Sequence, residues 1–218
     1  MIASVFIDAF RFIPDHASLL FHKGVGTVEL AFAALGIAIG LALPLGLWLG
    51  HKHRGLFLAL ALSNFGRALP SIVLIGFAIL IFHFSLFGDC MVALIVIAIP
   101  PILTNSFFAV DGVDRDVVEA ARGMGLTEAQ ILVRVELPLG LPLIVAGLRI
   151  ASVFVIATAT IAGIVGGGGL GDIIANPAAY RDAGVLGASY CVAALALVTA
   201  GALALLQRAA FRRMSPTT

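Results

Sequence analysis

Five apolar runs, each about twenty residues or longer, decide what this chain can fold into. They cover about 24–50, 57–85, 90–109, 138–165 and 184–208. A helix needs about 20 apolar residues to cross the hydrocarbon layer of a membrane. Charged residues make up 11% of the chain, whereas soluble domains contain about 25%. The runs therefore predict an all-α integral membrane protein with about five transmembrane helices.

The second run contains a proline, Pro70, and leaves a count of six helices open. Proline removes a backbone donor and clashes with the preceding turn, so it bends or breaks a helix. We expect a kink at this position. A split into two short helices is the alternative, and it raises the count from five to six.

Basic side chains gather after the first, third and fifth runs, which five crossings place on the same side of the membrane. Loops rich in lysine and arginine face the cytoplasm. The basic residues on this side are His51, Lys52, His53, Arg54, Arg115, Arg122, Arg134, Arg208, Arg212 and Arg213. The sequence therefore predicts a transmembrane domain at 24–208 with a cytoplasmic loop at 110–138, a cytoplasmic tail at 209–218 and an external, interfacial segment at 1–23.

The loop between the third and fourth runs, Asp111 to Pro138, is the charged segment of this chain. It holds six acidic and three basic side chains, which cannot lie in hydrocarbon because burying a charge there is too costly. We interpret it as a loop that contacts a partner on one side of the membrane. The alternative is an ordinary amphipathic loop helix that lies on its own bundle.

Two short helices are predicted within the charged segment. Asp114 is placed to cap a first helix that runs to Gly123. We expect Gly123 and Gly125 to adopt the left-handed backbone conformation that ends a helix. Thr127 followed three residues later by Gln130 has the capping-box pattern that starts a second helix.

The first of these helices has a narrow apolar stripe. Val113, Val117, Ala120, Ala121 and Met124 recur at steps of three and four residues, which places them close together on a helix surface. Both alanines are small, so we expect a partner surface to approach the backbone closely there.

The charged segment resembles the EAA loop of ABC importer permeases. The letters EAA at 119–121, glycine at 125 and VELP at 135–138 match the family pattern EAA-x3-G-x9-I-x-LP, with valine at 135 in place of isoleucine. In general layout the resemblance covers about residues 24–208. It implies a type I, MetI-like permease fold in a prokaryotic plasma membrane, and coupling helices that dock on a cytoplasmic ATPase.

The resemblance also implies roles for individual residues of the loop. Glu119 pairs with the ATPase surface, Ala120 and Ala121 permit close approach, and Gly125 turns the chain. The full set of implied coupling residues is Asp116, Glu119, Ala120, Ala121, Arg122, Gly123, Met124, Gly125, Leu126 and Thr127.

Polar and helix-breaking residues inside the apolar runs mark a candidate translocation pathway or gate. Irregular backbone and polar groups at membrane depth are tolerated only where protein or water covers them. The set is Arg67, Pro70, Pro100, Thr104, Asn105, Arg149, Thr158, Gly168 and Gly169. We expect the proline pair Pro100 and Pro101 to unwind its helix locally and this turn to border the pathway. The alternative is a structural kink whose hydroxyl and amide groups are satisfied within the protein.

Two elements of this set also resemble the importer family. Arg67 to Pro70 is similar to its R-x-[IL]-P element, which begins a helix lining the pathway. The glycine-rich segment, residues 163–172, is similar to its G-A-G-G-L-G element, where small residues let helices cross closely near the external gate.

The implied function is that of a membrane subunit in an ATP-driven importer. Its partners are an ABC ATPase dimer that binds ATP and magnesium, a second permease that is identical or paralogous, an extracytoplasmic substrate-binding protein, and membrane lipid. The chain itself is expected to bind no cofactor, metal or nucleic acid and to have no catalytic residue. Cys90 and Cys191 lack a metal-ligand spacing, and we interpret both as buried small residues.

The substrate is indicated by further stretches. EAARGMGLT at 119–127, VELPLGLPLIVAGLR at 135–149 and TATIAGIVGGGGLGDII at 158–174 are similar to the osmoprotectant branch of the family, whose permeases carry glycine betaine, choline, carnitine or proline betaine. Methionine importers are the alternative, and an ATP-independent channel or membrane scaffold is a distant one.

Overall fold

The computed structural model describes residues 2–214, and it describes side chains in this range except at 2–4, 63, 65–68 and 209–214. This part of the chain is helical throughout, apart from short turns, and contains no strand. The prediction of an all-α fold is confirmed.

Ten α-helices and one π-helical turn follow each other along the described chain. They are α1 (Ile2–Asp15), α2 (Ala17–His51), α3 (Leu56–Ala68), α4 (Ser71–Phe82), α5 (Leu86–Asp111), α6 (Arg115–Gly123), α7 (Glu128–Ile131), the π-helical turn Leu132–Glu136, α8 (Leu137–Ile164), α9 (Gly171–Ile174) and α10 (Pro177–Met214). Four apolar stretches of the described chain are long enough to cross a membrane: α2, α5, the continuous helix 128–164 that contains α8, and α10.

The second apolar run is two helices rather than one kinked helix. Leu69 and Pro70 have extended backbone, with ψ of 127° and 133°, between α3 and α4, because proline excludes the preceding residue from the helical region. Helices of 13 and 12 residues are about 20 and 18 Å long, and each is too short to cross the membrane alone. The expected kink at Pro70 is therefore wrong, and the alternative of two short helices describes this region.

Glycines set the close packing of the bundle formed by α2, α5 and α8. A Cβ atom at Gly50 would lie 2.5 Å from the carbonyl oxygen of Phe107, and one at Gly140 would lie 2.5 Å from that of Ala109. Gly46 and Gly147 are similarly close to α5. Small residues at these positions allow the helix backbones to meet, around a core that includes Leu94, Ile102 and Phe107.

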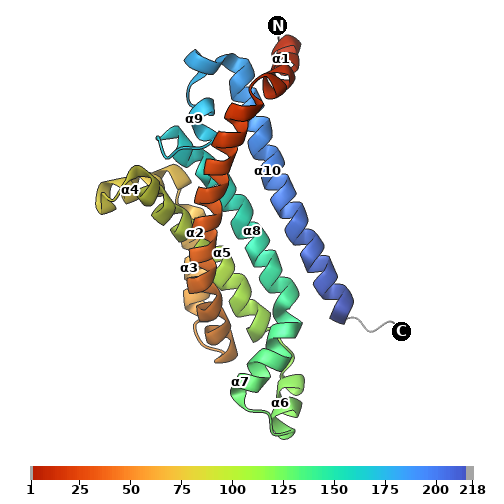
Figure 1. Ribbon diagram of the computed structural model, residues 1–218. Coiled ribbons are helices and arrows are strands. Elements are labelled where there is room, and N and C mark those ends of the chain that lie inside the picture. The colour runs from red at the N-terminus through yellow and green to blue at the C-terminus, as the bar shows by residue number, and fades with distance from the viewer. Residues whose placement is uncertain (1, 215–218) are drawn as a thin grey trace.

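The two ends of the bundle carry different elements (Figure 1). The end of α2, the helices α6 and α7, and the end of α10 lie at the lower end, which we name the α6 end. The helix α1 and the glycine-rich segment lie at the opposite end, while α4 turns outward from the bundle.

The N-terminal helix packs on the last helix. Phe12 and Ile13 contact a small cluster that includes Ala188, and the Phe10 and Tyr190 rings stack at 5.1 Å. The first long helix begins at Ala17, seven residues before the expected start at 24, because the apolar residues that precede residue 24 continue the same helix.

Candidate functional site

The first helix of the charged segment forms as predicted. Asp114 caps α6, Arg115–Gly123, and its Oδ1 atom accepts a hydrogen bond of 2.9 Å from the backbone N–H of Asp116. A capping carboxylate accepts a hydrogen bond from a backbone N–H that the helix leaves unpaired. Its negative charge also interacts favourably with the positive end of the helix dipole.

The second helix, α7, starts with the predicted capping box. The backbone N–H of Gln130 donates to Thr127 Oγ1 at 3.4 Å, and that of Thr127 donates to Gln130 Oε1 at 2.9 Å. Between the helices Gly125 has a φ of +87°, whereas Gly123 remains in α6. The left-handed turn expected at both glycines is therefore made by Gly125.

A small core holds the two helices together. Val118, Ala121 and Ile131 are buried against one another, and Val113, Leu126 and Val135 pack around them. The predicted stripe does not form a single face: Ala121 is 2% exposed and belongs to the core, whereas Met124 is 75% exposed. We expected a partner surface to approach the backbone at both alanines, but only Ala120 is exposed to a partner.

The outer face of α6 is a combination of acidic, small and apolar groups. This face consists of Asp116, Val117, Glu119, Ala120 and Gly123 of α6 and of Met124, the residue that follows the helix, and all six are exposed. An exposed methionine beside a small residue gives a partner an adaptable apolar contact, and Glu119 supplies a charge next to it. We name these six residues the α6 outer face.

Two further implied coupling residues, Arg122 and Leu126, make contacts within the segment itself. The guanidinium of Arg122 forms an ion pair of 3.0 Å with Glu128 at the start of α7. Leu126 packs on the small core. A hollow of about 330 Å³ beside Glu119 is lined by Arg115, Arg122 and His53 of the α2–α3 turn.

A buried contact between α2 and the charged segment was missed by sequence reasoning. His51 Nδ1 lies 2.6 Å from Glu136 Oε2, and His51 Nε2 lies 3.2 Å from Glu128 Oε2. The histidine and Glu136 are 7% and 1% exposed. Their separation of 85 residues leaves no local signal, and the sequence places His51 only among the basic residues that follow the first apolar run.

Pro100 and Pro101 do not unwind their helix. Both lie inside the continuous helix α5. Thr104 donates from its hydroxyl to the carbonyl oxygen of Ala59 at 3.2 Å, and Asn105 donates from its amide to that of Pro101 at 2.8 Å. The expected local unwinding is therefore wrong, and the stated alternative of internally satisfied polar groups describes this region.

The other candidate pathway residues are not gathered at one site. Arg149 is half-buried on α8 and has no ion pair among the residues that the structure describes. Thr158 is buried about two and a half turns further along the same helix. Pro70 lies in the α3–α4 break. The side chain of Arg67 lies outside the described residues.

The glycine-rich segment packs tightly on α2 at the end opposite to α6. Gly168 and Gly169 have φ of +87° and +91°, and a Cβ atom at Gly169 would lie 2.5 Å from Thr27 Oγ1. The backbone N–H of Leu170 donates to the same hydroxyl at 2.9 Å. Lys23 forms an ion pair with Asp172. The predicted close approach of backbone is observed here.

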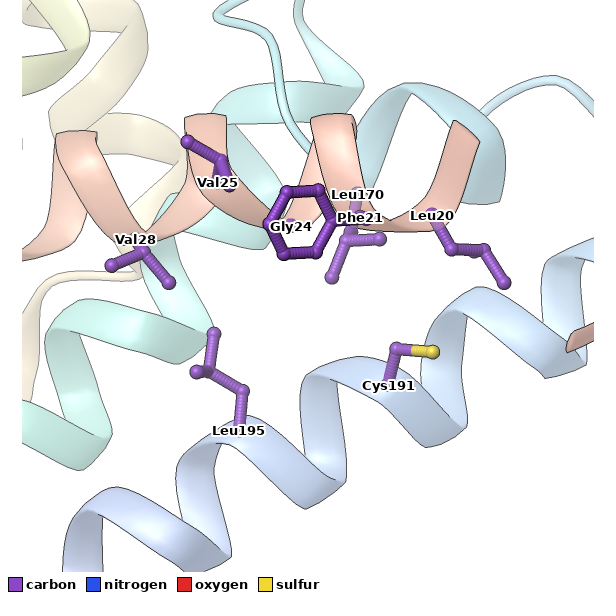
Figure 2. A pocket seen from close by; sticks show the side chains of 8 residues that line it. All are labelled: Leu20, Phe21, Gly24, Val25, Val28, Leu170, Cys191 and Leu195. Atoms are coloured by element: carbon purple, nitrogen blue, oxygen red, sulfur yellow. The ribbon is translucent and has the colours of Figure 1, made fainter. Parts of the chain in front are cut away.

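An apolar groove of about 370 Å³ lies between α2 and α10 near this end (Figure 2). It is lined by Leu20, Phe21, Gly24, Val25, Val28, Leu170, Cys191 and Leu195. A charged or zwitterionic solute loses its hydration in such a groove without gaining polar partners, so this groove does not fit the expected substrates. The described residues contain no cluster of potential metal ligands.

Comparison with known proteins places the chain in a family. Residues 42–215 match the family model of the binding-protein-dependent transport system inner membrane component. The chain is 37% identical to the carnitine transport permease protein OpuCB of Listeria monocytogenes, over 83% of this chain and 82% of that protein. It is 32% identical to the choline transport system permease protein OpuBB of Bacillus subtilis, over 91% of both.

Solved structures agree with this result. The fold matches a chain of the MetNI methionine ABC transporter in an inward-facing conformation, with a TM-score of 0.76, 26% identity, and coverage of 90% of this chain and 98% of that one. The resemblance to importer permeases and the MetI-like fold are confirmed. The chain belongs to the family of inner membrane components of binding-protein-dependent transport systems.

Proposed function

We propose that this chain is the permease subunit of an ATP-driven importer that takes up a quaternary ammonium osmoprotectant such as glycine betaine, choline, carnitine or proline betaine. The observation that carries the transport role is the α6 outer face, which lies on the first of two short capped helices at one end of the bundle (Figure 1). The proposed substrate class is supported by relatives named for carnitine and choline transport, which align over most of this chain.

The α6 end faces the cytoplasm in this proposal, and an ATPase dimer docks there. Glu119, Ala120 and Met124 contact the ATPase, which binds ATP and magnesium on its own surface. Because α5 ends at Asp111 and the continuous helix of α8 starts at Glu128, movement of α6 is passed directly into two helices of the bundle.

A second permease subunit completes the pathway. Exposed apolar side chains on α4 and α10, among them Ile72, Phe77, Leu197 and Leu205, leave faces for a partner subunit and for lipid. An extracytoplasmic binding protein delivers substrate to the end that carries the glycine-rich segment. We assign the aromatic faces that attract a quaternary ammonium to that binding protein.

The test measures uptake of labelled glycine betaine, choline, carnitine and methionine in cells that lack the gene. These cells are complemented with the wild-type chain or with Glu119→Arg. We expect at least one quaternary ammonium compound to need the wild-type chain, and Glu119→Arg to abolish its uptake at normal membrane abundance. Arg134→Glu, a charge reversal of an exposed residue outside α6, is the matched control and should retain uptake.

Methionine is the second candidate substrate, favoured by the structural match to the methionine transporter. Uptake of methionine alone would contradict the osmoprotectant proposal and leave the importer role in place. Normal uptake of every compound by Glu119→Arg would contradict the coupling role of α6.

A further inference from the structure

The contact between His51 and Glu136 links α2 to the charged segment, and these two parts of the molecule are not adjacent in the sequence. The charged segment continues directly into α5 and α8, whereas α2 leads into α3 instead. The segment reaches α2 through side chains, with 2.6 Å between His51 Nδ1 and Glu136 Oε2. A carboxylate as buried as Glu136 is stable only with a partner of good geometry, and His51 is that partner.

The same imidazole extends the contact toward α6. Its Nε2 atom lies 3.2 Å from Oε2 of Glu128, the first residue of α7, and Glu128 also pairs with Arg122 in the last turn of α6. The two ring nitrogens of His51 therefore each lie within contact distance of a different carboxylate. One side chain at the end of α2 thus contacts the first residue of α7 and the last residue of the π-helical turn that follows α7.

The other end of α2 is bonded to the glycine-rich segment. Thr27 Oγ1 accepts the Leu170 N–H within a buried contact, and Lys23 pairs with Asp172. Thr27 and His51 belong to one uninterrupted helix and are about 36 Å apart along its axis at 1.5 Å per residue. The helix α2 therefore has side-chain bonds to the charged segment at one end and to the glycine-rich segment at the other.

A second histidine of the same turn makes a different kind of contact. His53 Nδ1 lies 2.8 Å from Asp111 Oδ1, but these side chains are 38% and 31% exposed. Pairs this exposed hold their elements weakly, because water competes for both partners. The burial of the two pairs therefore distinguishes a firm link at His51 from a weak one at His53.

We propose that His51 is a positioning residue for transport: it transfers movement of the charged segment to α2, which carries it to the glycine-rich segment at the other end. The proposal rests on the proposed function, since it assumes that an ATPase moves α6. It adds α2 to the helices that respond, although α2 is not continuous in sequence with the charged segment.

The test uses the complete transporter in proteoliposomes and measures substrate imported per ATP hydrolysed. In His51→Leu combined with Glu136→Met, apolar side chains of similar size replace the buried pair, which preserves folding better than removal of one partner. We expect this variant to bind the ATPase and hydrolyse ATP, while import per ATP falls about fivefold or more, a typical size for coupling between sites.

Three further variants separate transmission from a structural role. Thr27→Val removes the hydroxyl at the far end of α2 and should lower import per ATP in the same way. Combined with His51→Leu and Glu136→Met, it should cause little further loss, because changes within one coupled unit are not additive. His53→Ala with Asp111→Ala is the matched control and should retain the wild-type ratio.

An unchanged ratio in His51→Leu with Glu136→Met would overturn the inference, as would a loss of ATPase binding in this variant or fully additive losses with Thr27→Val. The proposed function has a separate readout in the same assay. If wild-type import does not depend on ATP, the importer role itself fails, whatever the histidine variants do.

Discussion

The carbonyl oxygen of Phe107 on α5 lies where a side chain at Gly50 on α2 would begin, with 2.5 Å between that oxygen and a Cβ atom at Gly50. The two helices are in backbone contact one residue before His51. This contact fixes the end of α2 beside the base of the charged segment, so that the buried histidine can reach Glu136.

Enlarging Gly50 should therefore separate α2 from α5. Gly50→Leu forces a side chain into backbone and should destabilise the protein by about 1–3 kcal/mol or more, the usual cost of overpacking. Thermal unfolding of the detergent-solubilised protein measures the effect. Gly36→Leu lies on the same helix but meets open space, and an equal loss of stability in that control would contradict the packing argument.

The glycines at the end of α6 should respond to alanine in opposite directions. Gly125→Ala places a Cβ at a φ of +87°, which costs about 1–2 kcal/mol. Gly123→Ala, inside α6 with open space around it, should stabilise the helix by about 0.5–1 kcal/mol. Hydrogen exchange of the amides at 115–131 distinguishes the two, and faster exchange in both variants would be the contrary result.

The adjacent alanines of the EAA sequence should also differ. Ala120→Leu changes the α6 outer face and should prevent ATPase binding with little effect on stability. Ala121→Leu instead overfills the core formed with Val118 and Ile131 and should destabilise the segment by about 1–3 kcal/mol. Copurification of the ATPase and thermal unfolding, measured together, report the two effects; identical profiles would show that the assigned faces of α6 are wrong.

Loss of the capping box should loosen α7 without disturbing the bundle. Thr127→Ala removes the hydroxyl that accepts the Gln130 N–H and should cost about 0.5–2 kcal/mol, seen as faster amide exchange at 128–131. Thr127→Ser keeps the acceptor and is the control. Equal exchange in wild type and Thr127→Ala would mean that the small core alone holds α7.

Local signals are sufficient for the starts of α6 and α7, because N-terminal capping depends on residues within three positions of the helix start. The sequence does not show which face of α6 is buried. Alanines at adjacent positions both fit a three- and four-residue pattern, and only the packing of Ile131 on Ala121 decides which one is covered. The same limit applies to Pro70, since a proline signals an interruption without fixing whether the helix bends or ends.

Contacts between distant parts of the chain left no trace in the sequence pattern. His51 and Glu136 are separated by 85 residues. His51 stands before three exposed basic residues, and Glu136 stands two residues after the exposed Arg134, so neither is marked as buried. Around Pro100 and Pro101 the tertiary packing of Ile97, Ile102 and Leu103 keeps α5 helical despite the missing backbone donors. In the proposed function the rest of the pathway is formed with a second subunit, whose position a single sequence does not contain.

Photo-crosslinking from α6 tests the central claim most directly. A photoreactive phenylalanine analogue in place of Met124, the most exposed apolar residue of the α6 outer face, should form a covalent adduct with the ATPase in the assembled transporter. The same analogue in place of Ile7, exposed on α1 at the opposite end, should form none. An adduct from Ile7 but not from Met124 would contradict the assignment of α6 as the site where the ATPase docks.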